Sequence, residues 1–172
     1  MYLDIKNPTE KISDDAVTVW RISNIIGHSI VMLVISALYI CAKIFHWYDW
    51  IVIVLLVLGG ITILSAIYEI GFQPTFLQRT WRYEIDEQFV QLKHGRCNVS
   101  HTIIPMEKVE YVRTEQGPIL RRYRLYSIEI GTTATSHTIP AIPEQKAIEL
   151  KAQIAVYAKL TDQAVLEGEH VV

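Results

Sequence analysis

The segment at positions 22–42 reads ISNIIGHSIVMLVISALYICA and the segment at positions 50–68 reads WIVIVLLVLGGITILSAIY; neither contains Asp, Glu, Lys or Arg. A helix needs about 20 predominantly apolar residues to cross the hydrocarbon core of a bilayer, and both segments have that length. The short link at positions 43–49 requires the two helices to be antiparallel neighbours. We therefore predict a transmembrane hairpin over residues 22–70.

The segment at positions 1–21 precedes the first span. It carries Asp14 and Asp15. The apolar stretch that follows is longer than the core of a signal peptide, which has about 7–15 residues. We therefore interpret the first span as a segment that is retained in the mature protein. Ser13 is a suitable N-cap for a short amphipathic helix on the membrane surface. A helix that simply leads into the first span explains the same residues equally well.

The orientation of the hairpin follows from its basic residues, because short cytoplasmic loops carry an excess of Lys and Arg. The link between the spans contains only Lys43. The outer flanks contain more, namely Lys6, Lys11 and Arg21 before the first span and Arg79 and Arg82 after the second. The bias predicts a multi-pass protein of the cell inner (plasma) membrane, with the N-terminus and the C-terminal domain in the cytoplasm.

The first span contains two polar residues, Asn24 and His28, that are four positions apart and share a helix face. They could form a proton or ligand relay, but interhelical hydrogen bonding is the simpler interpretation. Gly27, Gly59 and Gly60 are predicted to be sites of close helix approach. Neither span contains a carboxylate, Lys or Arg, which argues against coupled transport.

The periodicity changes after position 78, where apolar and polar residues begin to alternate. The pattern predicts six strands, at positions 81–85, 89–93, 99–105, 109–114, 126–131 and 137–141. After Pro143, apolar residues recur at helical spacing, which predicts an amphipathic helix. We expect residues 78–160 to form a β-barrel or sandwich capped by this helix, which makes the chain an α+β membrane protein. Residues 161–172 form an acidic tail.

The charges of the C-terminal part are balanced. From Arg79 onward there are twelve Lys and Arg and twelve Asp and Glu, which argues against nucleic acid as the main partner. The two cysteines, Cys41 and Cys97, fall in different regions and are not expected to pair, which fits a reducing compartment.

Several short motifs in this part are similar to those of a known family. They are IPMEKV at positions 104–109, EQGPI at 115–119 and IPAIP at 139–143, preceded by the hairpin and a Trp-Arg-Tyr strand. The chain resembles the bacterial pleckstrin-homology-like (PH-like), membrane-flanked domain family, the YdbS-like proteins. The resemblance implies a PH-like barrel at the inner membrane face, an accessory or scaffolding role beside a larger membrane protein with related domains, and no enzyme activity. One departure is Arg124, at a turn position where the family usually has glycine.

The most basic cluster is a candidate contact for anionic lipid or for a partner. It consists of Arg121, Arg122 and Arg124, which Lys93, Arg96 and Arg113 could join if their hairpins are adjacent. A solvated hairpin tip is the alternative interpretation.

Other chemistry has weaker support in the sequence. His94, Cys97 and His101 have metal-ligating side chains but lack the spacing of a zinc site, so we expect no metal and no other cofactor. No nucleophile elbow, phosphate loop or HExxH motif is found, so we expect no catalytic residues.

Three functions fit these features. The first is a membrane-anchored binding or scaffolding module that assembles with itself or with a larger membrane protein. The second is an anionic-lipid-binding module that uses the basic hairpin. The third, an oligomeric pore or export component, is the least favoured because the spans have no charged residues to line a path.

Overall fold

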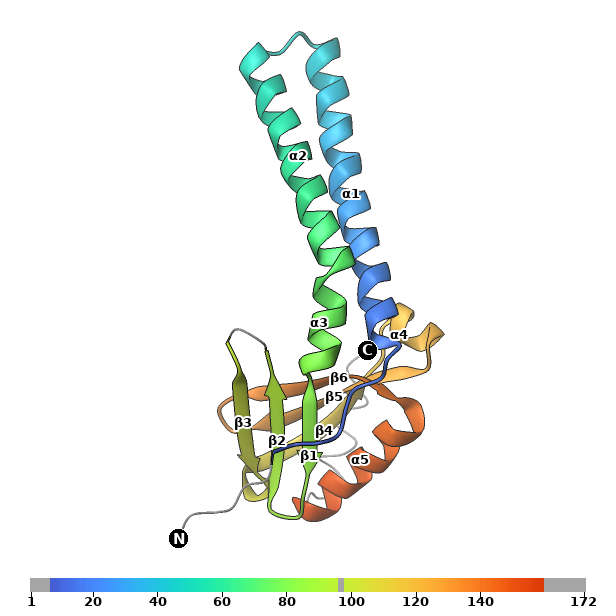
Figure 1. Ribbon diagram of the computed structural model, residues 1–172, viewed down its shortest axis with the longest axis vertical. Helices are drawn as coiled ribbons and strands as arrows, with labels where there is room; N and C mark the ends of the chain where they lie inside the picture. The colour runs from blue at the N-terminus through green and yellow to red at the C-terminus, as the bar shows by residue number, and fades with distance from the viewer. Residues whose placement is uncertain (1–6, 96–97, 160–172) are drawn as a thin grey trace. The chain divides into compact units, whose positions relative to one another are not determined.

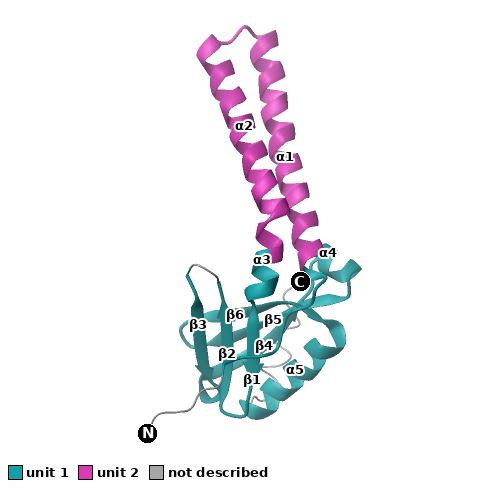
Figure 2. Ribbon diagram, in the orientation of Figure 1, with its two compact units in different colours: residues 1–16, 76–172 teal, residues 17–75 magenta. Residues whose placement is uncertain are grey.

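The computed structural model describes residues 7–95 and 98–159. Its elements follow the order shown in Figure 1, from two long helices through six strands to a C-terminal helix. The chain divides into two compact units (Figure 2). The first unit consists of residues 17–75 (unit 2 in Figure 2), and the second consists of the residues before and after them (unit 1 in Figure 2).

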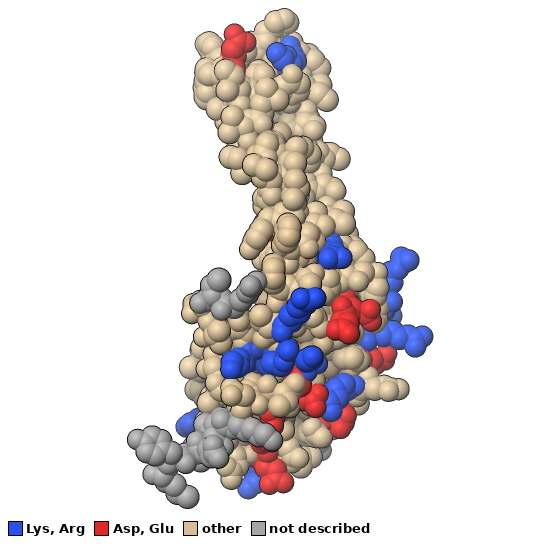
Figure 3. Space-filling model, viewed as in Figure 1, with Lys and Arg blue, Asp and Glu red and all other residues tan. Residues whose placement is uncertain are grey.

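The first unit is a helical hairpin. It consists of α1 (Ala16–Ile44) and α2 (Asp49–Gly71), which are both long and apolar enough to cross a membrane. Figure 3 shows the surface of the hairpin as an almost uncharged area with a basic and an acidic residue at its bend. Large apolar side chains such as Leu33 and Leu64 are 69% and 70% exposed. Apolar surface of this extent indicates contact with lipid.

The two helices begin and end differently from the predicted spans. Of the two interpretations of the segment before the first span, the structure supports a helix that leads into the span, since α1 begins at Ala16 and continues into the apolar segment. After α2, a short helix, α3 (Gln73–Thr80), follows almost directly. Pro74 is tolerated in its first turn because the N–H groups there have no partner within the helix.

Packing inside the hairpin is concentrated near the bend, where Ala42, Val52 and Leu55 are buried. The prediction of close helix approach is wrong for Gly27 and Gly60, since a methyl group added to either would meet no atom within 4 Å. At Gly59 the nearest atom would be Cγ2 of Ile35 at 3.9 Å, which is ordinary contact. Gly27 and Gly60 therefore leave open space on the hairpin surface, whereas Gly59 is buried and in ordinary contact with Ile35.

The second unit contains two three-stranded antiparallel sheets, each with its strands in chain order. The first sheet is formed by β1 (Arg82–Ile85), β2 (Phe89–His94) and β3 (Ser100–Pro105). A single turn of 3-10 helix, η1 (Met106–Lys108), leads to the second sheet, formed by β4 (Val109–Glu115), β5 (Leu125–Thr132) and β6 (Ser136–Pro143). All six predicted strands are thus confirmed, with ends that differ from the prediction by two residues at most.

The C-terminal helix α5 (Glu144–Tyr157) packs against all three strands of the second sheet. Its buried side chains, Ala147, Leu150 and Ile154, are those that recur at helical spacing in the sequence. The core that they join includes Val90, Leu92, Ile104, Val112, Ile128, Ile130 and Ile139. Each large aliphatic side chain in such a core contributes about 1.5–3 kcal/mol by leaving water.

An extended segment at residues 7–15, here called the N-terminal strap, connects the two sheets. Glu10 and Tyr83 exchange backbone hydrogen bonds of 3.2 and 3.0 Å, which extends the first sheet beyond β1. The backbone N–H of Ser13 donates to the carbonyl of Ala141 in β6 at 3.1 Å. Pro8 and Ile12 are buried. Because α1 follows the strap and β1 follows α3, the hairpin is an insertion within the β domain.

Two non-glycine residues have positive φ angles where the second sheet meets its connections. Ala141, at +52°, lies in a bulge of β6 opposite β5, and this bulge presents its carbonyl to the strap. Arg124 also has φ +52°, and its carbonyl accepts the N–H of Glu144 at 3.1 Å. A left-handed conformation costs about 1–2 kcal/mol for a residue with a Cβ. This is the conformation that the glycine usual at the position of Arg124 adopts without strain.

If the strap closes the β domain, removing its apolar anchor must destabilise both sheets. Ile12 is 3% exposed, so Ile12→Ala should lower the free energy of unfolding by about 2–4 kcal/mol. Hydrogen exchange of β1 and β6 amides in the full chain in detergent micelles measures the change. Ile148→Ala is the matched control, since Ile148 on α5 is 64% exposed. Equal effects of the two substitutions would contradict the role given to the strap.

Candidate functional site

The basic cluster lies on a short helix and the turn after it. This helix, α4 (Pro118–Arg122), connects the antiparallel strands β4 and β5, so the tip of this hairpin is a short helix. Pro118 starts the helix, and Gln116 donates its side-chain N–H to the carbonyl of Leu125 at 3.1 Å, which fixes the connection to β5. Arg121, Arg122 and Arg124 are exposed. Their guanidinium groups are therefore available to an anionic surface.

The three other predicted members of the cluster have separate positions. Lys93 lies in the first sheet and donates from Nζ to Oδ1 of Asn7 in the strap at 2.9 Å. Arg113 lies in the second sheet and is bound to Glu129. Arg96 lies outside the described residues. The hairpins that carry Lys93 and Arg113 are thus in different sheets, and both side chains already have partners.

Arg113, Glu129 and Tyr111 form a polar network across β4 and β5. Nε and Nη2 of Arg113 donate to Oε2 of Glu129 at 2.8 and 2.6 Å, and the hydroxyl of Tyr111 donates to Oε1 at 3.1 Å. Burial alone would raise the pKa of Glu129, but hydrogen bonds from Arg113, Ser136 and Tyr111 outweigh it and lower the pKa. The same hydrogen bond raises the pKa of the Arg113 guanidinium.

Gly131 explains why this network can form. It faces Tyr111 across β4 and β5, and a Cβ at this position would lie 2.0 Å from the Tyr111 ring. The glycine therefore lets the aromatic ring lie flat over the strand and reach Glu129. The network fixes the second sheet and leaves no free cation in it for a ligand.

A second polar cluster, which the sequence analysis did not predict, lies in the hairpin around Glu69. One carboxylate oxygen contacts Nε2 of His28 at 3.2 Å, and the other accepts the hydroxyl of Ser65 at 2.8 Å. The amide of Asn24 donates to the Glu69 carbonyl at 2.9 Å. Glu69 lies one residue beyond the charge-free segment, and its four-residue spacing from Ser65 was the available signal.

This cluster supports one of the two sequence interpretations of Asn24 and His28. Both side chains bind α2, so they form the interhelical hydrogen bonds that the simpler interpretation requires. Arg21 and Thr75 add a hydrogen bond of 3.3 Å further along the helices. The ends of the hairpin distant from its bend are thereby held together.

The two histidines considered as possible metal ligands, His94 and His101, have other contacts. The His94 ring stacks on Trp81, with centroids 4.7 Å apart. Nε2 of His101 lies 3.3 Å from Oε1 of Gln91, and Cys97 lies outside the described residues. Within residues 7–95 and 98–159, no three His, Cys, Asp or Glu residues gather in a way that could hold a metal ion.

A pair of long apolar helices joined to two packed antiparallel sheets and a covering C-terminal helix defines a membrane protein with a PH-like domain. The family described as "Bacterial PH domain" matches residues 22–158, and the chain belongs to this family. It is 35% identical over 160 residues to the UPF0699 transmembrane protein YdbS of Bacillus subtilis (strain 168), a match that covers 93% of this chain and 99% of that protein. No solved structure matches.

These comparisons confirm the resemblance identified in the sequence. The family is a PH-like domain family and not an enzyme family. The chain is therefore a membrane-associated PH-like module. The candidate functional surfaces are the exposed arginines of α4 and those sheet edges that the strap does not cover.

The ion pair in the second sheet should make the stability of the β domain depend on pH. Glu129→Gln should lower the free energy of unfolding at pH 7 by about 1–3 kcal/mol, because it removes the buried carboxylate that binds Arg113 and leaves the guanidinium only its exposed ion pair with Glu115 at 3.0 Å. Since the folded-state pKa of Glu129 is lowered, this stabilisation is present above the unfolded pKa of about 4.3 and is lost as the pH falls through the folded pKa.

Hydrogen exchange of β5 amides in the full chain, measured between neutral pH and about pH 3, tests this dependence. The difference between the wild type and Glu129→Gln should narrow below about pH 4. Glu149→Gln is the control, because Glu149 pairs with Lys146 on the surface at 3.4 Å and should have little effect. A difference that stays constant with pH would contradict the assigned role of Glu129.

Proposed function

We propose that this protein is a membrane-anchored adaptor that assembles with itself or with a larger membrane protein. Both long helices cross the bilayer, and the N-terminus and the PH-like domain lie on the cytoplasmic side. The observation that carries the proposal is the insertion of the hairpin into the β domain. Because the strap precedes α1 and β1 follows α3, the chain enters and leaves the membrane from the same folded domain.

Several features support this function. The hairpin exposes large apolar side chains along its length, and its short bend requires both helices to cross if either does. Basic residues are more frequent on the outer flanks than at the bend, which favours a cytoplasmic domain. A PH-like domain held in this way needs no lipid affinity to reach the membrane, which leaves its exposed surfaces free to bind partners.

Chemical crosslinking in intact cells tests assembly and orientation together. A membrane-permeant, lysine-specific crosslinker should convert the natively expressed chain into a discrete species of higher mass. An impermeant reagent of the same reach should not, because the lysines of the β domain are inside. The experiment with the impermeant reagent uses the Lys43→Arg variant, which removes the only lysine at the bend. Monomer alone with the permeant reagent would refute assembly, and crosslinking from outside would refute the orientation.

A second candidate function is recognition of anionic lipid by α4. Arg121 and Arg122 are exposed, while Ile119 and Leu120 beside them are only partly buried, so the helix offers both charge and apolar contact. Near an anionic surface each basic residue contributes about 1 kcal/mol. Such contacts would orient a domain that the hairpin already anchors.

This function predicts a change at α4 that depends on lipid charge. In nanodiscs, amides of residues 119–124 should exchange more slowly when phosphatidylglycerol replaces phosphatidylcholine. Replacing Arg121, Arg122 and Arg124 with Ala should abolish the difference, whereas Lys146→Ala on α5 should preserve it. Exchange that does not respond to lipid charge in the wild type would exclude this function.

A further inference from the structure

The edges of the two sheets are protected to different degrees. The strap pairs with β1 through Glu10 and contacts β6 at Ala141. The edge strand β4 has a register shift between Val109 and Tyr111 and carries charged side chains. Bulges and charges of this kind are devices that discourage strand pairing. The fourth edge, β3, has the sequence SHTIIP, without Asp, Glu, Lys or Arg.

The register of the first sheet shows which backbone groups of β3 are free. The N–H of Met106 donates to the carbonyl of Gln88, so these two residues form a hydrogen-bonded pair at the end of the β2–β3 ladder. Hydrogen-bonded pairs alternate along an antiparallel ladder, so the backbone groups of Ile104 and Thr102 also face β2. The backbone N–H and C=O groups of Ile103 and His101 therefore face away from β2. Within the described residues, no other backbone group pairs with this edge.

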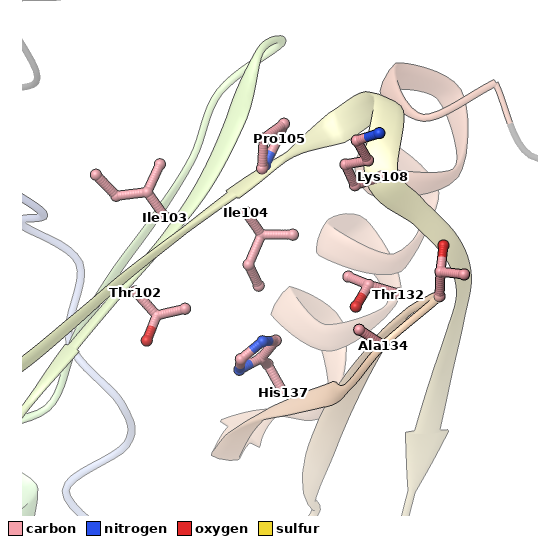
Figure 4. A pocket seen from close by; sticks show the side chains of 9 residues that line it. Thr102, Ile103, Ile104, Pro105, Lys108, Thr132, Ala134 and His137 are labelled. Carbon is pink, nitrogen blue, oxygen red and sulfur yellow. The ribbon is translucent and has the colours of Figure 1, made fainter.

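A cavity of about 260 Å³ opens beside the same edge. In Figure 4, Thr102 and Ile104 point from β3 into the space toward His137, while Ile103 points to the opposite side. Thr132 and Ala134, from the turn between β5 and β6, form the far wall. Among the described residues, the lining is mostly apolar in surface and includes Lys108 and His137 but no carboxylate, and the nearby carboxylate of Glu110 accepts the hydroxyl of the lining residue Thr133 at 2.9 Å.

We propose that β3 and this cavity bind an extended peptide segment of a partner protein by strand addition. The peptide pairs with the outward N–H and C=O groups of Ile103 and His101. One apolar side chain of the added strand enters the cavity against Ile104, and an acidic residue beside it faces Lys108. The inference rests on the proposed adaptor function and specifies the chemistry of the partner.

An extended peptide fits these observations better than lipid does. The spacing of free donors and acceptors along β3 is matched by another backbone, whereas an acyl chain offers no hydrogen-bonding groups. Alternation along the added strand then sends every second side chain toward the cavity. Backbone pairing supplies affinity, and the cavity supplies selectivity for the apolar side chain.

Two substitutions at position 103 separate backbone pairing from side-chain contact. Ile103→Pro removes the outward N–H and preserves the bonds to β2, because proline is tolerated at an edge when its missing N–H faces solvent. Ile103→Ala removes more of the side chain than Ile103→Pro does and keeps the N–H, so a larger loss of binding for proline than for alanine reports backbone pairing. Ala134→Leu fills the cavity from its far wall and leaves the strand edge unchanged.

The probe is a fluorescein-labelled peptide, Glu-Val-Thr-Leu-Thr-Val-Glu, titrated against the full chain in nanodiscs by fluorescence anisotropy. The same peptide with both threonines replaced by proline is the control that cannot pair as a strand. Binding should be saturable for the first peptide and absent for the second. Ile103→Pro and Ala134→Leu should each weaken it about tenfold, and Ile103→Ala should weaken it about threefold or less.

Several outcomes would overturn the proposal. These are the absence of saturable binding, equal affinity for Ile103→Pro and Ile103→Ala, and dependence on Arg121 and Arg122 in place of Ile103. Release of a dimer to monomer by Ile103→Pro without any peptide would assign the edge to a second copy of this chain. If Ile103→Pro still forms the crosslinked assembly and no peptide binds, only the strand-addition proposal is refuted. The proposed adaptor function is then unaffected.

Discussion

Closure of the two sheets by the N-terminal strap is the interaction on which the rest of the structure depends. The strap pairs with Tyr83 in the first sheet and contacts Ala141 in the second, and it buries Ile12 between these contacts. Burial raises the pKa of the Tyr83 hydroxyl to about 12, as expected for a phenol removed from water. The strap is continuous with α1, which begins at Ala16, directly after these contacts.

Much of the fold could be predicted from sequence because its signals are local. Two charge-free segments identify the hairpin, and period-two alternation identifies the six strands. The strap gave no such signal, because its residues show neither the periodicity of a helix nor that of a strand, and its partners are distant in sequence. The helix α4 was also missed, because a five-residue helix carries too little periodicity to distinguish it from a turn.

The candidate sites depend on tertiary partners, and here prediction was less complete. The residue types of the basic cluster were evident, but Arg113 and Arg121 have different roles because one lies opposite Glu129 and the other does not. No sequence pattern predicts that Arg113 pairs with Glu129. Glu69 was excluded from the predicted span by one position, although α2 continues to Gly71. The edge of β3 could be recognised as unprotected only from the structure, which shows what protects the other sheet edges.

The hydrogen bonds between Arg21 and Thr75 and between Asn24 and Glu69 have a consequence for folding kinetics. Strap closure joins Ser13 to Ala141, a contact of high sequence separation that would ordinarily be slow to form. The inserted hairpin shortens the search, because once its helices have paired, their linked ends behave as one short, stiff connection. A loop whose ends are already held together adds little to the entropic cost of closing the β domain around it.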